Sequence, residues 1–229
     1  MKIEEAFPIL PNLYNVKFGI LKNHPNLKEP IDLTKLKGNK GFAGQFLEKL
    51  LLLNLSNSAL DFENGELKTN KSKSDGSPME TMAITQIGTQ FDDLFYNDKS
   101  FHETHLYRKI ESILYVPAVK GEKEEDWYFL PAHYLDLKDN DALKKILDND
   151  FETIRSKVHA MMDDPEDGML HTANGQYMQI RTKDSKPYSP IYSNKLKRYV
   201  SNKGFAFYFK KEFMQAIQDS VLPSRKITQ

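Results

Sequence analysis

The sequence predicts an α/β fold, a mixed α+β arrangement in which a central mixed sheet is flanked by helices. Hydrophobic residues make up 39% of the chain and charged residues 28%, which is typical of a folded globular protein. Segments with helical and with strand periodicity are interleaved along the chain. The length of 229 residues is enough to bury a core within one domain.

The first third of the chain contains the clearest helix pattern. Phe42, Phe46 and Leu50 recur every four residues, and Leu47 and Leu51 widen this apolar stripe. Prolines interrupt the first 35 residues, so we expect only one or two short helices there. Residues 54–58 are expected to form a loop.

The segment DFENGELKT, residues 61–69, predicts a turn that leads into a strand. Asn64-Gly65 is the turn signal, and the alternation after it places Glu66 and Lys68 on one face and Leu67 on the other. A polar loop is expected at 71–78 and a long basic loop after residue 181. The other predicted strands are 81–87, 112–118, 127–131, 176–181 and 205–209, and the other predicted helices are 141–149, 151–162 and 210–219.

Composition excludes several kinds of chemistry. The chain has no cysteine, which rules out disulfides, zinc–thiolate sites and a cysteine nucleophile. No run of 18 apolar residues and no signal-peptide pattern is present, so we expect a cytoplasmic protein without a membrane partner. No histidine pair has zinc-binding spacing. The abundance of Lys, Asn and Ile suggests a bacterial source with an AT-rich genome.

The formal net charge of zero hides a polar distribution. Residues 181–211 carry nine basic side chains and one acid, a balance of 9 − 1 = +8. Residues 121–167 carry six basic and fourteen acidic side chains, a balance of 6 − 14 = −8. A polyanion responds to local charge because salt screens interactions beyond about 8–10 Å. The basic segment is therefore either a nucleic-acid contact or a solvated face.

Four residues in the first third have the chemistry of phosphodiester hydrolysis: Glu48, Asp61, Glu66 and Lys68. Mg²⁺ takes one or two carboxylates together with water and phosphate oxygens, and Asp61, Glu66 and the main-chain carbonyl of Leu67 could supply its protein ligands. Lys68 could orient the attacking water and meet the developing charge. Taken alone, the spacing favours a surface hairpin in which Glu66 and Lys68 form an ion pair over a catalytic site.

Blocks in the same order along most of the chain resemble the MutH and Sau-type GATC endonucleases, which belong to the PD-(D/E)xK nucleases. The matching segments are KGFAGQFLE, the pair Asp61 and GELKT, GSPMET, HLYRKIESILYVP, GQYMQIRTK and GFAFYFKKEF. The stretch between Asp61 and Glu66 is short compared with this family.

The resemblance implies a restriction-endonuclease-like core whose two lobes form a DNA-binding cleft, within one domain covering residues 1–229. The catalytic lobe would be about 36–130 and the recognition lobe about 131–229. Lys109 would join the catalytic set, with Mg²⁺, or Mn²⁺ in its place, as the cofactor. Arg181, Lys183 and Tyr208 would read bases. The residues expected on DNA phosphates are Lys40, Lys195, Lys197, Arg198, Lys203, Lys210 and Lys211.

Three functions fit these expectations. The first is a type II restriction endonuclease that cuts double-stranded DNA at a short palindrome, implied to be GATC, either with a second copy of the chain on the other strand or by two sequential nicks. The second is a mismatch-repair endonuclease that nicks one strand. The third belongs to another class: a sequence-specific DNA-binding module without activity.

Overall fold

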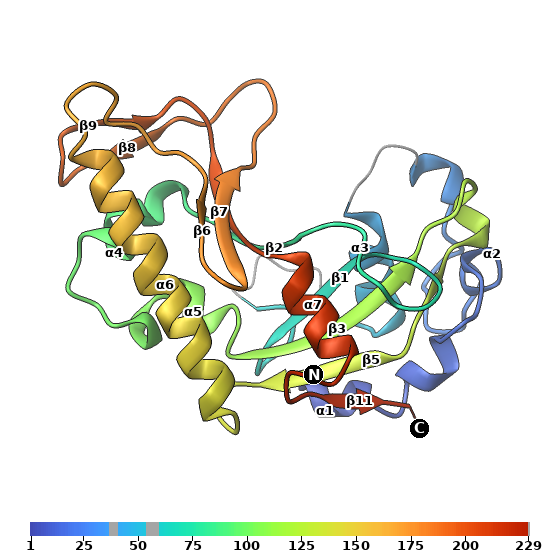
Figure 1. The fold of residues 1–229 in the computed structure, drawn as a ribbon. Coiled ribbons are helices and arrows are strands. Elements are labelled where there is room, and N and C mark those ends of the chain that lie inside the picture. Colours follow the sequence, from blue (N-terminus) through green and yellow to red (C-terminus); the bar gives the residue numbers. More distant parts are fainter. Residues whose placement is uncertain (37–40, 54–59, 229) are drawn as a thin grey trace. The chain divides into compact units, whose positions relative to one another are not determined.

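A computed structural model describes residues 1–36, 41–53 and 60–228 of the chain (Figure 1). The chain divides into two compact units. Unit 1 comprises Met1–Glu80, Glu111–Asp136 and Gln215–Gln229, and unit 2 comprises Thr81–Ile110 and Leu137–Met214. The predicted division near residue 130 separates the chain at one point, whereas in the structure the chain passes between units after residues 80, 110, 136 and 214.

Unit 1 is built on a mixed sheet, which confirms the predicted fold class. The strands along the sheet are β1 (Glu66–Ser72), β3 (Ser112–Val119), β5 (Ala132–Asp136) and β11 (Arg225–Ile227), and β4 (Tyr128–Phe129) also pairs with β3. β1 runs parallel to β3, while β4 and β5 run antiparallel to β3, and β11 runs antiparallel to β5. On its other side the end of β1 is bridged by Ser72 to Pro78, while within the described residues no strand pairs with the part that holds Glu66, Leu67 and Lys68.

Short helices precede the sheet in unit 1. They are α1 (Ile3–Ala6), η1 (Leu10–Leu13), α2 (Phe18–Leu21) and η2 (Leu33–Leu36), with η5 (Glu124–Asp126) later in the chain. The apolar stripe forms α3 (Phe42–Leu50), as predicted, and Phe46, Leu47 and Leu50 are fully buried. They belong to one core cluster with Leu67 and Leu114 of the sheet, so α3 covers the Leu67 face of β1.

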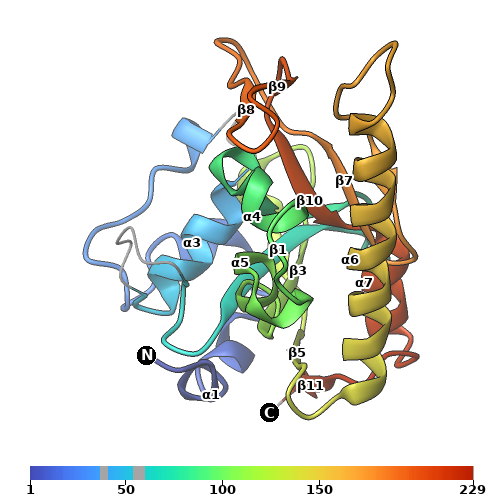
Figure 2. The ribbon, with the colours of Figure 1, turned by 90° about the vertical axis from the view of Figure 1, so that its left-hand side faces the viewer.

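Unit 2 contains a second sheet and the longest helix. The strand order is β2 (Met82–Gln86), β10 (Phe205–Phe209), β7 (Met178–Thr182) and β6 (Ala173–Asn174), all antiparallel. α6 (Asp141–Met162) packs beside β6 and β7 (Figure 2). The other helices are η3 (Gly88–Gln90), α4 (Phe91–Phe95), η4 (Phe101–Glu103), α5 (His105–Arg108) and α7 (Lys211–Gln218), whose last turn belongs to unit 1.

Several predicted elements need correction. The two helices expected at 141–149 and 151–162 are one continuous helix, because Asn149-Asp150 does not break it. The basic loop contains a hairpin, β8 (Ile191–Ser193) paired with β9 (Arg198–Ser201). β5 and β11 were not predicted, and β1 extends to Ser72, into the expected loop. The loop expected at 54–58 lies outside the described residues.

None of the helices in the described part of the chain has both the length and the apolar character needed to cross a bilayer.

Candidate active site

The alternation of β1 brings Glu66 and Lys68 together, as the sequence predicts. The Lys68 ammonium group forms an ion pair with Oε2 of Glu66. The Glu66 side chain is only 2% exposed and that of Lys68 is 15% exposed, so the pair is largely shielded from water. The alternative, an exposed ion pair on a surface hairpin, is therefore wrong, because both side chains are largely buried. A buried ion pair loses its hydration, and its surroundings must offset that loss.

A tight turn returns Asp61 to the same strand. The amide of Phe62 donates to the carbonyl of Gly65 at 2.9 Å, and the amide of Leu67 donates to Oδ2 of Asp61 at 2.9 Å. The short stretch between Asp61 and Glu66 therefore forms a closed turn. Asp61 contacts the strand beside Glu66.

The same hydrogen bond fixes the direction of the Leu67 carbonyl. The N–H and C=O groups of a strand residue point to the same side of the strand. β3 lies on one side of β1, and the Leu67 amide is directed to Asp61 on the other side. The Leu67 carbonyl is consequently directed to the free edge of β1, where Asp61 lies.

The carboxylates of this cluster repel one another. Burial, followed by the charge of the adjacent Glu66, raises the pKa of Asp61, while Lys68 and the bond from Leu67 act in the opposite direction. Burial and the charge of Asp61 raise the pKa of Glu48 on α3. Glu48, Asp61, Glu66 and Lys68 thus form one electrostatic cluster within unit 1, in which the ammonium group of Lys68 acts on the carboxyl groups of Glu48 and Asp61 and pairs with that of Glu66.

The donor set fits a hard divalent cation. No group of three His, Asp or Glu side chains within the described ranges is arranged to hold a metal ion by itself. The predicted set differs, because it combines two carboxylates, Asp61 and Glu66, with the carbonyl of Leu67, and Mg²⁺ completes its shell with water and phosphate oxygens. A cation bound here would offset the repulsion that raises the pKa of Asp61.

Gly65 is required for this turn, and we expect Gly65→Ala to destabilise unit 1. A Cβ at residue 65 would overlap the carbonyl oxygen of Ser112 and lie 2.6 Å from Cδ1 of Ile3. Overpacking of this kind costs about 1–3 kcal/mol, and each kcal/mol lowers the melting temperature by roughly 2–4 °C at this chain length. Thermal unfolding measures the change. Gly121→Ala is the control, since only Cβ of Asp126, at 4.0 Å, lies near; equal melting of both variants would contradict the requirement.

Two further predicted residues belong to the other unit or lie outside the described residues. Lys109 follows α5 and belongs to unit 2, where its amide donates to the carbonyls of His105 and Leu106. Lys40 lies outside the described residues.

The predicted base readers meet on the second sheet. The guanidinium carbon of Arg181, on β7, lies 4.4 Å from the ring centroid of Tyr208, on β10. Tyr208 is 7% exposed while Arg181 is exposed. The buried phenol ring therefore makes a cation–π contact with a guanidinium group that stays accessible to solvent. Lys183 is exposed at the end of β7, where its amide donates to the carbonyl of Gly204 at 2.9 Å.

The predicted phosphate contacts divide into two groups. Lys195 and Lys211 are exposed. Arg198 and Lys210 are half-buried and engaged with the main chain: Arg198 donates to the carbonyls of Met162, at 2.8 Å, and Gly168, and Lys210 donates to that of Gln176, at 3.0 Å. These two cations hold the fold of unit 2.

Asp150 is a residue that the sequence interpretation missed. It is buried within α6, and its carboxylate accepts from the amides of Gln176 at 2.5 Å, Tyr177 at 2.6 Å and Met178 at 2.7 Å. A Cβ on Gly175 would lie 2.5 Å from Oδ1 of Asp150, so the turn also needs this glycine. Asp150 thereby fixes the start of β7, the strand that carries Arg181. The only signal in the sequence was an acid on the apolar face of a helix.

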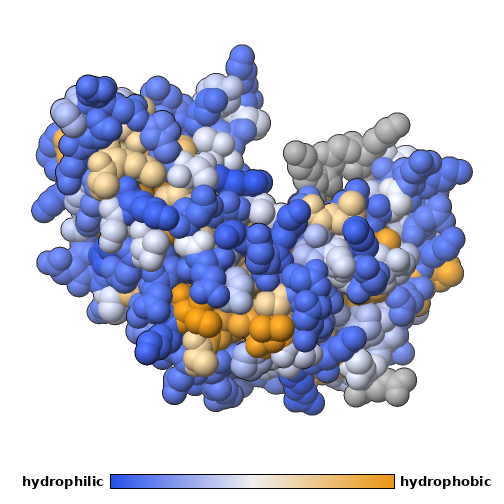
Figure 3. Space-filling view, in the orientation of Figure 1, coloured by the Kyte–Doolittle hydropathy of each residue, from blue (hydrophilic) through white to orange (hydrophobic). Residues whose placement is uncertain are grey.

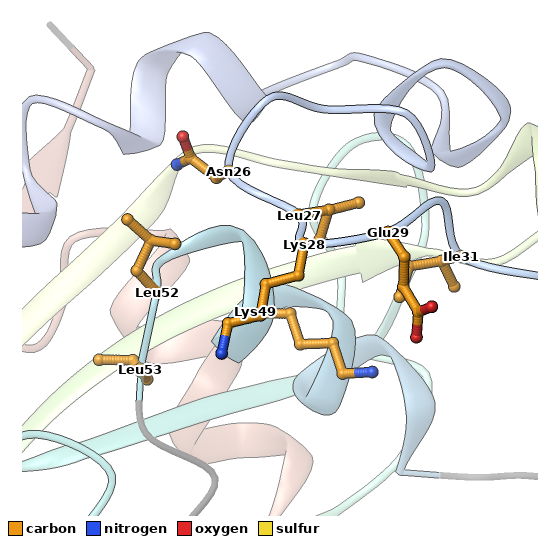
Figure 4. Close-up of a pocket in the computed structure, with 8 residues that line it drawn as sticks. All are labelled: Asn26, Leu27, Lys28, Glu29, Ile31, Lys49, Leu52 and Leu53. Atoms are coloured by element: carbon orange, nitrogen blue, oxygen red, sulfur yellow. The ribbon is translucent and has the colours of Figure 1, made fainter.

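A pocket of about 340 Å³ in unit 1 lies elsewhere (Figure 4). It is formed by the segment after α2 and the end of α3, and none of the four cluster residues lines it. The lining residues are Asn26, Leu27, Lys28, Glu29, Ile31, Lys49, Leu52 and Leu53.

No family model matches the sequence, and no curated protein is similar to it at a significant level.

Proposed function

We propose that this chain is a Mg²⁺-dependent endonuclease of the restriction type, which hydrolyses double-stranded DNA at a short palindrome such as GATC. The observation that carries the proposal is the clustering of Glu48, Asp61, Glu66 and Lys68 around the free edge of β1. These residues come from a helix, a turn and a strand. A structural ion pair would need Glu66 and Lys68 alone and would gain nothing from two more carboxylates.

Each residue of the cluster has a role in this chemistry. Asp61, Glu66 and the carbonyl of Leu67 would hold the metal, which when bound polarises the phosphate and lowers the pKa of a coordinated water. Lys68 would hydrogen-bond the attacking water and the phosphate oxygen on which charge develops. Glu48 adds negative charge beside Lys68 and keeps its ammonium group within the cluster. Lys109 stays a proposed member of the set through the family resemblance.

The second sheet would supply base recognition. Arg181 and Lys183 can donate to guanine O6 and N7 in the major groove, each good pair discriminating by about 1–3 kcal/mol. Tyr208 would act by holding the Arg181 guanidinium flat over its ring, because the phenol is itself buried. The exposed Lys195 and Lys211 would contact phosphates.

Incubation of the purified chain with unmethylated plasmid DNA and Mg²⁺ tests the proposal. We expect autonomous linearisation, with ends that map to one short palindrome, because restriction requires no activating partner. Slow nicking that depends on an added activator would favour the repair function instead.

Two controls accompany this assay. The first is the same reaction with EDTA, and the second is the variant Lys49→Ala. Lys49 is next to Glu48 in the sequence but lines the separate pocket. We expect EDTA to stop cleavage and Lys49→Ala to leave it unchanged. DNA binding without cleavage under any divalent cation would contradict the proposal and favour the inactive binding module.

A further inference from the structure

The hairpin β8–β9 of unit 2 exposes two tyrosines side by side. Tyr192 and Tyr199 are paired across the strands, are 44% and 58% exposed, and their ring centroids lie 5.2 Å apart in an edge-to-face arrangement. The neighbouring Ile191, Ser193 and Val200 are buried. The hairpin therefore anchors one face in the unit and presents the two phenol rings on the other.

The turn of this hairpin is held in one conformation by α4. The carboxylate of Asp92 accepts from Oγ of Ser193 at 2.5 Å and from the amides of Asn194 at 2.7 Å and Lys195 at 3.3 Å. At the other end of the turn, Arg198 is bound to the carbonyls of Met162 and Gly168. A surface fixed in this way loses little conformational entropy on binding.

Exposed cations lie in the turn that joins the two tyrosine strands, and the carboxylate of Asp92 beneath this turn is engaged by Ser193 and two amides. Lys195 and Lys197 are exposed in the turn, and Nζ of Lys203 lies 5.0 Å from the ring centroid of Tyr188. The acid of this segment, Asp184, directs its carboxylate to the amides of Ser189, at 2.7 Å, and Gly204, at 2.6 Å. At the upper left of Figure 3, where β8 and β9 lie in the same view of Figure 1, most of the surface is hydrophilic.

We propose that the β8–β9 hairpin is a DNA-contacting ribbon in which Tyr192 and Tyr199 lie against the sugar–phosphate backbone while Lys195 and Lys197 neutralise phosphates. A lysine-flanked, rigid ribbon matches a polyanion, and a two-stranded ribbon has the size of the DNA major groove. A tyrosine offers an apolar ring for the sugar and a hydroxyl for the phosphate. The proposal rests on the DNA binding of the proposed function, and not on its chemistry.

This ribbon contributes affinity that is independent of sequence. Contacts with phosphate and sugar set the position of a protein on the duplex but carry no base information. The two kinds of side chain also differ in their response to salt, because only the lysines displace counterions.

The test is duplex binding in EDTA, where hydrolysis cannot occur, measured by anisotropy at several salt concentrations on a GATC duplex and a scrambled one. For the double variant Tyr192→Ala, Tyr199→Ala we expect a Kd about ten-fold higher on both duplexes, with an unchanged salt slope. For Lys195→Ala, Lys197→Ala we expect the slope to fall by about 1.8, since each phosphate contact contributes about 0.9. Lys145→Ala on α6 is the matched control and should bind as the unaltered chain does.

The outcomes separate this inference from the proposed function. If the chain binds DNA and the tyrosine variant binds equally well, the ribbon is overturned while the nuclease stands. If the tyrosine variant has a lowered melting temperature, the test rests on the variant Lys195→Ala, Lys197→Ala. An unchanged salt slope of DNA binding in that variant overturns the ribbon. Binding that depends on the ribbon without cleavage in Mg²⁺ would overturn the nuclease and keep the ribbon. Failure of the unaltered chain to bind either duplex would overturn both the ribbon and the nuclease. Binding of the two tyrosines to another copy of the chain would overturn the ribbon.

Discussion

Replacing Asp61 by Asn is expected to abolish DNA cleavage, by about 10³-fold or more, and at the same time to make the metal-free protein more stable. The loss of activity follows from removing a metal ligand, since a bound cation supplies several kcal/mol of transition-state stabilisation. The gain of stability follows from the raised pKa of Asp61, which shows that burial and Glu66 disfavour the carboxylate. An asparagine can keep the bond from the Leu67 amide without carrying charge.

The pH dependence has a definite sign. Because the pKa of Asp61 is higher in the folded than in the unfolded protein, the folded state binds the proton more tightly. The protonated Asp61 therefore adds to the free energy of unfolding at low pH. This stabilisation is lost as the pH rises above about 4, the ordinary pKa of an aspartate, and through the raised pKa of Asp61 in the folded protein. The melting temperature of Asp61→Asn minus that of the unaltered chain should grow with pH across this range. Added Mg²⁺ should raise the melting temperature of the unaltered chain but not that of the variant.

Glu63→Gln is the matched control for Asp61→Asn. Glu63 lies in the same turn but is exposed, and hydrogen bonding to the N-terminal ammonium group lowers its pKa. We expect full cleavage and a slightly lower melting temperature at neutral pH, the opposite sign to Asp61→Asn. Unchanged cleavage in Asp61→Asn would remove Asp61 from the mechanism.

Replacing Asp150 by Ala is expected to produce the largest loss of stability, about 3–5 kcal/mol. The change leaves the amides of Gln176, Tyr177 and Met178 without their acceptor, and each unsatisfied buried donor costs roughly 1–3 kcal/mol. Urea unfolding followed by circular dichroism measures the change. Base discrimination should decline together with stability, because β7 carries Arg181.

Asp148→Ala is the control for Asp150→Ala. It removes the same charge from the same helix two residues away, on a different side of α6, because successive residues are about 100° apart. We expect a change within about 0.5 kcal/mol. A small effect in Asp150→Ala would show that the turn before β7 is held by other contacts.

The local features of the candidate active site were accessible from sequence because they depend on short-range rules. Strand alternation places Glu66 and Lys68 on one face, and the four-residue spacing of Phe42, Phe46 and Leu50 predicts α3. The signal Asn64-Gly65 marks the turn, although the sequence did not show that Gly65 lies against Ser112 of β3. That contact is made between segments far apart in the chain.

The features that were missed depend on long-range hydrogen bonds. Two helices were predicted on either side of residue 150, but the helix is continuous, and three amides from residues 176–178 bind the buried carboxylate of Asp150. The prolines at 187 and 190 suggested a loop throughout the basic segment, whereas the hairpin begins directly after them and is anchored by Asp92, a hundred residues earlier. For Tyr208 the sequence left two roles open, a base reader or a core aromatic of the strand 205–209, and the structure shows that its side chain is buried.

The interleaving of the two units limits how the gene can be dissected. Each unit is assembled from separate stretches of sequence, and the candidate active site lies in the one that also receives residues 215–229. Truncation at any single codon within 81–214 would therefore deprive both units of part of their sheet or helices. Isolating unit 1 would require joining its three segments with designed linkers. A C-terminal deletion that includes β11 would remove an edge strand of the sheet that contains Glu66.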